Sequence, residues 1–177
     1  NLGFHLDGAR LWNALEVTKE TPKDYGAVFD TISVCLSKGL GCPIGSVLIG
    51  DSVIMEKAIR IRKMLGGGMR QVGVLAAAGL YALDHHRKRL SEDHQKANEI
   101  GQILQNKSYV AKLQPIETNI LIFELASHIN ADQFVLNLEK KGVLISNMGW
   151  GKLRMVTHLD YNLEMHEKLI ETLESIS

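Results

Sequence analysis

Apolar residues in the first half of the chain form short runs separated by stretches with helical spacing. The runs at 4–7, 31–37 and 46–50 are apolar and end in polar or glycine positions, which is typical of buried strands. A helix is expected after the first run, and a basic amphipathic helix follows Asp51, a good N-cap residue. Strands that alternate with helices predict a parallel sheet covered on both faces, with ligands at the carboxyl ends of its strands.

The second half begins with long helices and ends in a compact mixed region. Residues 71–107 carry a helical apolar pattern that is rich in alanine at its start. Beyond it we expect strands at 110–113, 119–125, 143–145 and 153–158, a helix at 131–141 and a terminal helix. We therefore predict three parts: an α/β region over 1–83, linking helices over 84–107 and a small α/β domain over 108–177.

Composition narrows the possible partners. The 177 residues carry 20 basic and 20 acidic side chains, so no basic surface for nucleic acid or an anionic membrane is expected. The longest uncharged stretch, 71–83, is far shorter than the roughly 20 apolar residues that span a bilayer. Cys35 and Cys42 lack metal-site spacing and are interpreted as reduced and structural. Small molecules and other subunits remain as partners.

Asp7 and Lys38 each follow a predicted strand and are the first candidates for chemistry. A carboxylate buried at a strand end needs a cation, which a protonated cofactor ring or simply Arg10 would provide. A lysine beside Gly39 and Gly41 that is partly desolvated has a lowered pKa, which favours the neutral amine that forms a Schiff base. The alternative for Lys38 is a solvated surface residue.

Four sequence blocks, in order, resemble the low-specificity threonine aldolases. They are His-Leu-Asp-Gly-Ala-Arg at 5–10, Ser-Val-Cys-Leu-Ser-Lys-Gly-Leu-Gly at 33–41, Arg-Lys-Met-Leu-Gly-Gly-Gly-Met-Arg-Gln at 62–71 and Arg-Met-Val-Thr-His-Leu-Asp at 154–160. The resemblance runs from residue 4 almost to the end of the chain.

The resemblance implies an α/β fold of fold-type I, the aspartate-aminotransferase-like class of pyridoxal-phosphate (PLP) enzymes. Residues 1–83 would belong to the large PLP-binding domain and 108–177 to the small carboxy-terminal domain. Lys38 would form the Schiff base with the cofactor, and Asp7 would contact its ring nitrogen. Arg10 would lie beside the cofactor or the substrate carboxylate, and Ser37 would contact the cofactor.

Three further cations are assigned roles through the same resemblance. Lys63 and Arg70 would add positive charge near the cofactor phosphate, toward which the amides of Gly66, Gly67 and Gly68 would point. Arg154 would bind the substrate α-carboxylate, because guanidinium offers a rigid bidentate fork. A flexible connection between helices is the alternative for the glycines, and an exposed strand residue is the alternative for Arg154.

The activity that the resemblance implies is PLP-dependent retro-aldol cleavage of L-threonine or L-allo-threonine to glycine and acetaldehyde. It also implies a cytoplasmic homodimer or homotetramer with shared sites. The start of the chain looks like a cut inside a larger protein, and the missing amino-terminal half would supply the ring stacked on PLP, a phosphate-binding loop and the base. We therefore expect the segment alone to be inactive.

Other interpretations remain open at this point. Asp and Lys also serve β-eliminating lyases and aminotransferases, and a non-catalytic association module is a further alternative. Asp84, His85, His86 and His94 lie in a charged helical stretch without metal-ligand spacing, so we expect a solvated helix face and no metal site. His158 and Asp160 are assigned no catalytic role.

Overall fold

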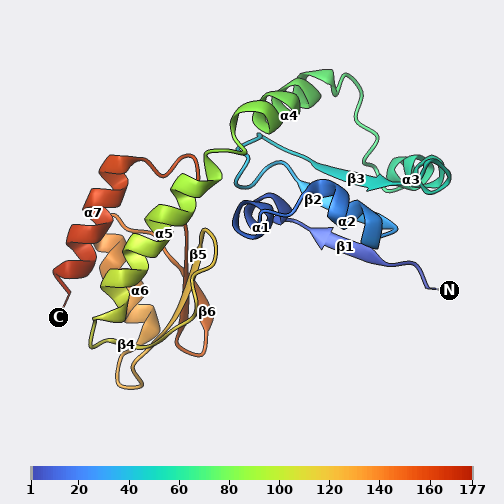
Figure 1. The fold of residues 1–177 in the computed structure, drawn as a ribbon. Helices are drawn as coiled ribbons and strands as arrows, with labels where there is room; N and C mark the ends of the chain where they lie inside the picture. Colours follow the sequence, from blue (N-terminus) through green and yellow to red (C-terminus); the bar gives the residue numbers. More distant parts are fainter. Residues whose placement is uncertain (1, 177) are drawn as a thin grey trace. The chain divides into compact units, whose positions relative to one another are not determined.

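The chain folds into two compact units, and the boundary between them falls between Leu90 and Ser91. The computed structural model describes residues 2–176 (Figure 1). The boundary falls inside the predicted linking segment 84–107. No helix within 2–176 is both long and apolar enough to cross a membrane.

The first unit contains a three-stranded sheet in the order β1 (His5–Gly8), β2 (Thr31–Cys35) and β3 (Ser46–Gly50). β1 and β2 are parallel, as predicted, but β3 is antiparallel to β2, so the expectation of an all-parallel sheet is wrong there. The reason lies in the connections. Both α1 (Leu11–Thr18) and α2 (Pro22–Val28) fall between β1 and β2, whereas residues 36–45 between β2 and β3 form no helix that could carry the chain across the sheet.

Four helices belong wholly to the first unit: α1 (Leu11–Thr18), α2 (Pro22–Val28), α3 (Ser52–Met64) and α4 (Gly73–His85). α1 places Leu11 and Leu15 against Ile32 and Val34 of β2, which forms a small core on one face of the sheet. α3 begins as predicted, because Asp51 Oδ1 accepts the amide hydrogen of Ile54 at 2.8 Å.

Helix α2 was missed by the pattern analysis, although the sequence carries a local signal for it. Thr21 precedes Pro22 at the first helical turn, and Asp24 Oδ2 accepts the Thr21 amide hydrogen at 2.7 Å. These contacts lower the pKa of the Asp24 carboxyl. The helix has no buried residues, so apolar periodicity could not reveal it.

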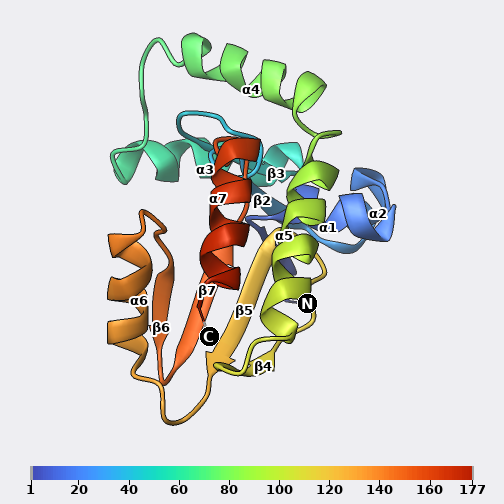
Figure 2. The same cartoon turned by 90° about the vertical axis from the view of Figure 1, so that its left-hand side faces the viewer.

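The second unit is a four-stranded antiparallel sheet with helices on one face (Figures 1 and 2). The sheet has the order β4 (Val110–Leu113), β5 (Ile120–Leu125), β7 (Lys152–Val156) and β6 (Ser146–Gly149). The helices are α5 (Leu90–Gln105), α6 (Ala131–Lys140) and α7 (Leu163–Glu174). Buried residues of all three helices and of β5 and β7 form one hydrophobic core.

The strand predicted at 143–145 is displaced to Ser146–Gly149. The reason is the tight hairpin that joins β6 to β7, in which Gly149, Trp150 and Gly151 all have positive φ angles. This turn fixes the register so that Ser146 pairs with Arg154. The apolar residues at 143 and 145 pack partly on the core instead.

A buried histidine joins α5 to α7 in the second unit. The Glu99 carboxylate accepts from His166 Nε2 at 2.8 Å, so His166 Nδ1 is left to accept the Tyr161 hydroxyl hydrogen at 3.1 Å in the neutral ring. Burial raises the pKa of Tyr161, and the side chains of Gln95 and His166 lower the pKa of Glu99. Tyr161, His166 and Glu99 therefore form one chain of hydrogen bonds between α5 and the start of α7.

The stability of the second unit should fall in strong alkali because of Tyr109. Burial raises the pKa of Tyr109 to about 12, above the ordinary value near ~10. Its stabilising contribution is complete below the unfolded-state pKa and is lost as pH rises from ~10 toward ~12, because the unfolded chain ionises first. Urea unfolding between these pH values should give a smaller loss for Tyr109→Phe than for wild type. Equal losses would contradict the assignment.

Candidate functional site

The ends of β1 and β2 bring the first candidate residues to one edge of the sheet. Asp7 pairs with Ser33 and Gly8 with Val34 in parallel register. A Cβ atom at position 8 would lie 2.8 Å from the Ser33 carbonyl oxygen, so only glycine permits this approach of the two strands. Because the strands are parallel, the residues that follow β2, including Ser37 and Lys38, leave the sheet at the same edge as Asp7.

Asp7 is exposed in this chain, which corrects the expectation of a buried carboxylate. Its Oδ1 atom accepts the amide hydrogen of Ala9 at 3.2 Å. Within residues 2–176 it forms no ion pair, so the simple pairing with Arg10 is not found. Arg10 is half-buried at the start of α1, where its carbonyl oxygen accepts from Asn13 and Ala14. The Asp7 carboxylate therefore keeps acceptor capacity for another group.

Lys38 lies in an ordered loop that residues 36–45 form between β2 and β3. The Leu36 amide donates to the Gly45 carbonyl at 2.9 Å, and the Cys42 amide donates to the Leu36 carbonyl at 3.1 Å. The Gly41 amide closes a turn on the Lys38 carbonyl at 2.8 Å. The Lys38 side chain is exposed rather than partly desolvated, and its amine forms no ion pair in the described part of the chain.

The residues that follow Lys38 in this loop are packed against the interior of the first unit. Leu40 is 1% exposed and belongs to a small core with Cys42, Ala82 and Leu90. A Cβ atom on Gly39 would lie 3.0 Å from Leu90 Cδ2 and 3.1 Å from Asn13 Nδ2. The exposed Lys38 side chain is therefore attached to a loop whose neighbouring residues are buried.

Two histidines expected on a solvated helix face are in fact involved in packing. His94 is buried, and His86 is half-buried with its Nδ1 atom 2.6 Å from the Leu40 carbonyl oxygen. The helical pattern missed both, because α4 ends at His85 and the chain turns before α5. No cluster of His, Cys, Asp and Glu suited to a metal ion occurs within residues 2–176.

The glycine-rich segment after α3 differs from the expected anion cradle. The Gly66 amide donates to the Lys63 carbonyl at 3.2 Å, and the Gly67 amide donates to the Arg62 carbonyl at 2.8 Å. Gly66 has a φ of 81°, so the segment is a glycine cap that satisfies carbonyl groups at the end of α3. Two of the three amides are thus engaged. The Lys63 and Arg70 side chains are exposed.

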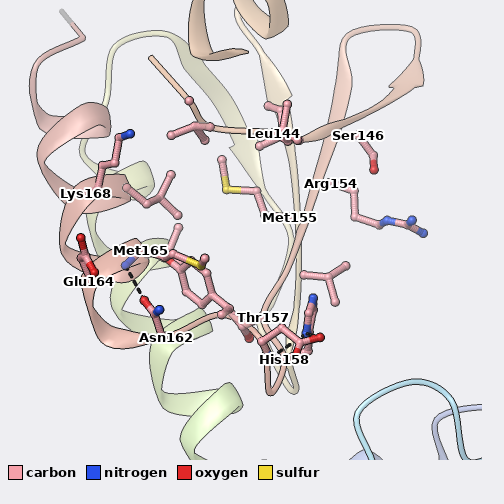
Figure 3. A pocket seen from close by; sticks show the side chains of 18 residues that line it. Leu144, Ser146, Arg154, Met155, Thr157, His158, Asn162, Glu164, Met165 and Lys168 are labelled. Carbon is pink, nitrogen blue, oxygen red and sulfur yellow. Dashed lines mark hydrogen bonds and ion pairs between the residues drawn. The ribbon is translucent and has the colours of Figure 1, made fainter. Parts of the chain in front are cut away.

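Arg154 lies on β7 in the second unit, where it faces away from the helices. Strand alternation buries Leu153 and Met155 on the helix side, and Figure 3 shows the Arg154 side chain on the opposite side of β7 from Met155. Its Nε atom is buried and has no hydrogen-bond partner among residues 2–176. Arg154 also borders a cleft of about 730 Å³ within this unit, together with Ser146, His158 and Lys168.

The sequence of the chain is similar to those of known proteins, and this similarity identifies its family. Residues 1–128 match the sequence model of the beta-eliminating lyase family. The chain belongs to this family. It is 40% identical over 158 residues to low-specificity L-threonine aldolase 1 of Arabidopsis thaliana, which covers 88% of this chain and 44% of the relative. It is 41% identical over 164 residues to the low specificity L-threonine aldolase of Escherichia coli K12, which covers 93% and 48%.

Solved structures share the fold of this family member. A putative L-allo-threonine aldolase from Listeria monocytogenes has a TM-score of 0.78 at 20% identity, covering 98% of this chain and 52% of that one. Ornithine aminotransferase from Toxoplasma gondii has a TM-score of 0.64 at 16% identity, covering 98% and 42%. The predicted α/β fold, that of the fold-type I class, is confirmed. The chain spans about half the length of the curated relatives that it matches.

Replacement of Gly8 tests the strand contact that positions Asp7. Gly8→Ala should lower the free energy of unfolding by about 1–3 kcal/mol, because the added methyl group meets backbone at Ser33 and cannot be accommodated by a rotamer change. Gly26→Ala in α2 is the matched control: a Cβ there meets nothing within 4 Å. It should be neutral or stabilising by up to ~1 kcal/mol. Denaturant unfolding that gave equal stabilities would contradict the contact.

Proposed function

We propose that the full-length protein is a PLP-dependent aldolase that cleaves L-threonine or L-allo-threonine to glycine and acetaldehyde. The identity of about 40% to two threonine aldolases over most of this chain carries the proposal. Asp7 and Lys38, an acid and an amine at one edge of a parallel strand pair, support it. A cytoplasmic homodimer or homotetramer is part of the same proposal.

The residues present in the first unit fit the cofactor. An exposed primary amine without an ion pair and an exposed carboxylate with spare acceptor capacity match the cofactor's aldehyde and its ring nitrogen, respectively. When bound, PLP supplies the electron sink for breaking a bond at the substrate α carbon. Lys38 Nζ would hold the cofactor covalently, and the Asp7 carboxylate would hold a proton on the ring nitrogen.

Four other polar residues complete the proposed cofactor contacts. Ser37 precedes Lys38 in the same exposed loop, and Arg10 begins the helix that follows Asp7. Lys63 and Arg70 are exposed cations that flank the glycine cap after α3. We assign the phosphate to their side chains rather than to the Gly66 and Gly67 amides, which are already engaged.

Arg154 is the proposed partner of the substrate carboxylate. A guanidinium binds a carboxylate through two parallel hydrogen bonds, which fixes its orientation as well as its position. The Nε atom without a partner on the helix-free side of β7 supports a ligand there. By orienting the carboxylate, Arg154 would select which bond at the α carbon is broken.

The proposed activity requires the remainder of the full-length protein. Val47, Leu48 and Ile49 of β3 are 43–49% exposed, although neighbouring strand residues point to opposite faces. A strand that is apolar on both faces is typical of the interior of a covered sheet. We propose that the other half of the protein packs over β3 and supplies the ring stacked on PLP, a phosphate-binding loop and the base.

Replacement of the proposed cofactor lysine gives the first test. In the full-length protein, borohydride reduction after PLP incubation should add the cofactor mass to the peptide that contains Lys38. Lys38→Ala should abolish both this adduct and the release of glycine. Lys57→Ala, which removes an exposed lysine from α3, should leave both intact. A wild-type protein without the adduct would refute the proposal.

Product analysis separates this activity from related ones. The aldolase releases glycine and an aldehyde from threonine. Pyruvate and ammonia from serine would indicate β-elimination, and dependence on a keto-acid acceptor would indicate transamination. Either result, with no glycine formed, would replace the proposed reaction while leaving Lys38 as the cofactor residue.

Replacement of Arg154 should affect substrate binding more than cofactor binding. Arg154→Lys keeps the charge but loses the bidentate fork, so kcat/KM for L-threonine should fall by about 10–100-fold, which corresponds to loss of one to two charge-assisted hydrogen bonds. PLP attachment to Lys38 should be unchanged. Steady-state kinetics on Arg154→Lys beside Lys152→Arg, a charge-conserving control on the same strand, would measure this. Equal kinetics would exclude the role.

A further inference from the structure

A histidine without a proposed cofactor or substrate contact, His86, binds the loop that carries Lys38. His86 directly follows α4 and caps it, with its amide donating to the Ala82 carbonyl at 2.8 Å. Its ring Nδ1 lies 2.6 Å from the carbonyl oxygen of Leu40, a residue that is 46 positions away and only two residues beyond Lys38. The contact therefore joins the end of α4 to the centre of the lysine loop.

The direction of this hydrogen bond is fixed by its acceptor. A carbonyl oxygen only accepts, so His86 Nδ1 must carry the hydrogen in either charge state of the ring. Tyr81, one α4 turn earlier, meets the His86 ring edge to face at 5.5 Å between centroids. The ring is thus held by its own helix while it donates to the loop.

Two further contacts fasten the same loop to the same support. The Cys42 thiol lies 3.7 Å from the Ala78 carbonyl oxygen on α4, and burial raises the pKa of this thiol. A Cβ on Gly79 would lie 3.2 Å from Leu36 Cδ1 at the start of the loop. Of the three contacts, only the one from His86 is a strong polar bond, and it engages Leu40, two residues after Lys38.

We propose that His86 is a positioning residue for the cofactor-bearing lysine. By donating to the Leu40 carbonyl, His86 fixes the turn in which the Gly41 amide donates to the Lys38 carbonyl, and so fixes the direction in which the lysine leaves the loop. Lys38 itself is exposed and forms no ion pair among the described residues, so its direction depends on this backbone. The inference rests on the proposed role of Lys38.

Two replacements of His86 isolate the hydrogen bond from the packing. Asn and Leu have nearly the same shape, but the Asn side-chain amide places a donor nitrogen on Cγ, where histidine has Nδ1, and Leu has none. His85→Leu is the control for loss of a neighbouring imidazole, because His85 is exposed and, among residues 2–176, forms a ring contact with Tyr81 but no hydrogen bond or ion pair. All three variants are made in the full-length protein, together with wild type.

Three measurements follow the effect. Borohydride trapping across a PLP titration gives the affinity with which Lys38 takes the cofactor. Hydrogen exchange of cofactor-free protein reports the order of the 36–45 amides, and a denaturant midpoint reports global stability. For His86→Leu we expect PLP affinity to fall and loop exchange to quicken by about tenfold each, the scale of one lost hydrogen bond to a buried group. The denaturant midpoint should fall by no more than the same tenfold change in the unfolding equilibrium constant implies. His86→Asn and His85→Leu should match wild type.

The outcomes separate this inference from the proposed function. If wild type takes no cofactor on Lys38, the proposed function itself fails. If wild type takes it and His86→Leu takes it equally well, the positioning role is overturned. Equal losses in His86→Asn and His86→Leu would also overturn the role, because they would assign the effect to the ring rather than to its donor.

Discussion

The close contact between Gly8 and the Ser33 carbonyl is the constraint on which the first candidate site depends. It lets β1 and β2 pair in parallel at a separation that a side chain at position 8 would prevent. Parallel pairing in turn sends Asp7 and the residues after β2 out at the same edge. An antiparallel pair would have placed the end of β1 beside the beginning of β2. Asp7 and Lys38 therefore leave the sheet at the same edge because position 8 is a glycine, which permits the parallel pairing.

The loop after β2 solves a second problem, which is how to expose a reactive amine on a well-defined backbone. Leu40 and Cys42 are buried, while Ser37 and Lys38 remain exposed. Backbone hydrogen bonds within 36–45 and the contact from His86 leave the loop few alternative conformations. A lysine side chain has high conformational entropy. When the loop backbone is already ordered, only the side chain loses conformational freedom as a ligand binds.

The second unit contributes by different means. Its antiparallel sheet buries one face under α5, α6 and α7 and places Arg154 on the other (Figure 3). The two units have separate cores, and each carries part of the proposed chemistry: the cofactor residues lie in the first unit and the carboxylate partner in the second. Family membership and the identity to threonine aldolases connect these parts into one proposed activity.

Local patterns in the sequence determined most of the elements. The strand and helix periods located β1, β2, β3 and α3, Asp51 marked a helix start, and four motif blocks indicated the family and the candidate residues. Turn and cap geometry, together with contacts between distant segments, decided the rest. The β2–β3 pair is antiparallel rather than parallel, and the glycine amides after α3 cap that helix rather than bind an anion. Because of the 149–151 turn, β6 lies at Ser146–Gly149 rather than at 143–145. The exposure of Asp7 and the contact of His86 with Leu40 depend on what lies nearby in space, and periodicity along a chain carries no information about such neighbours.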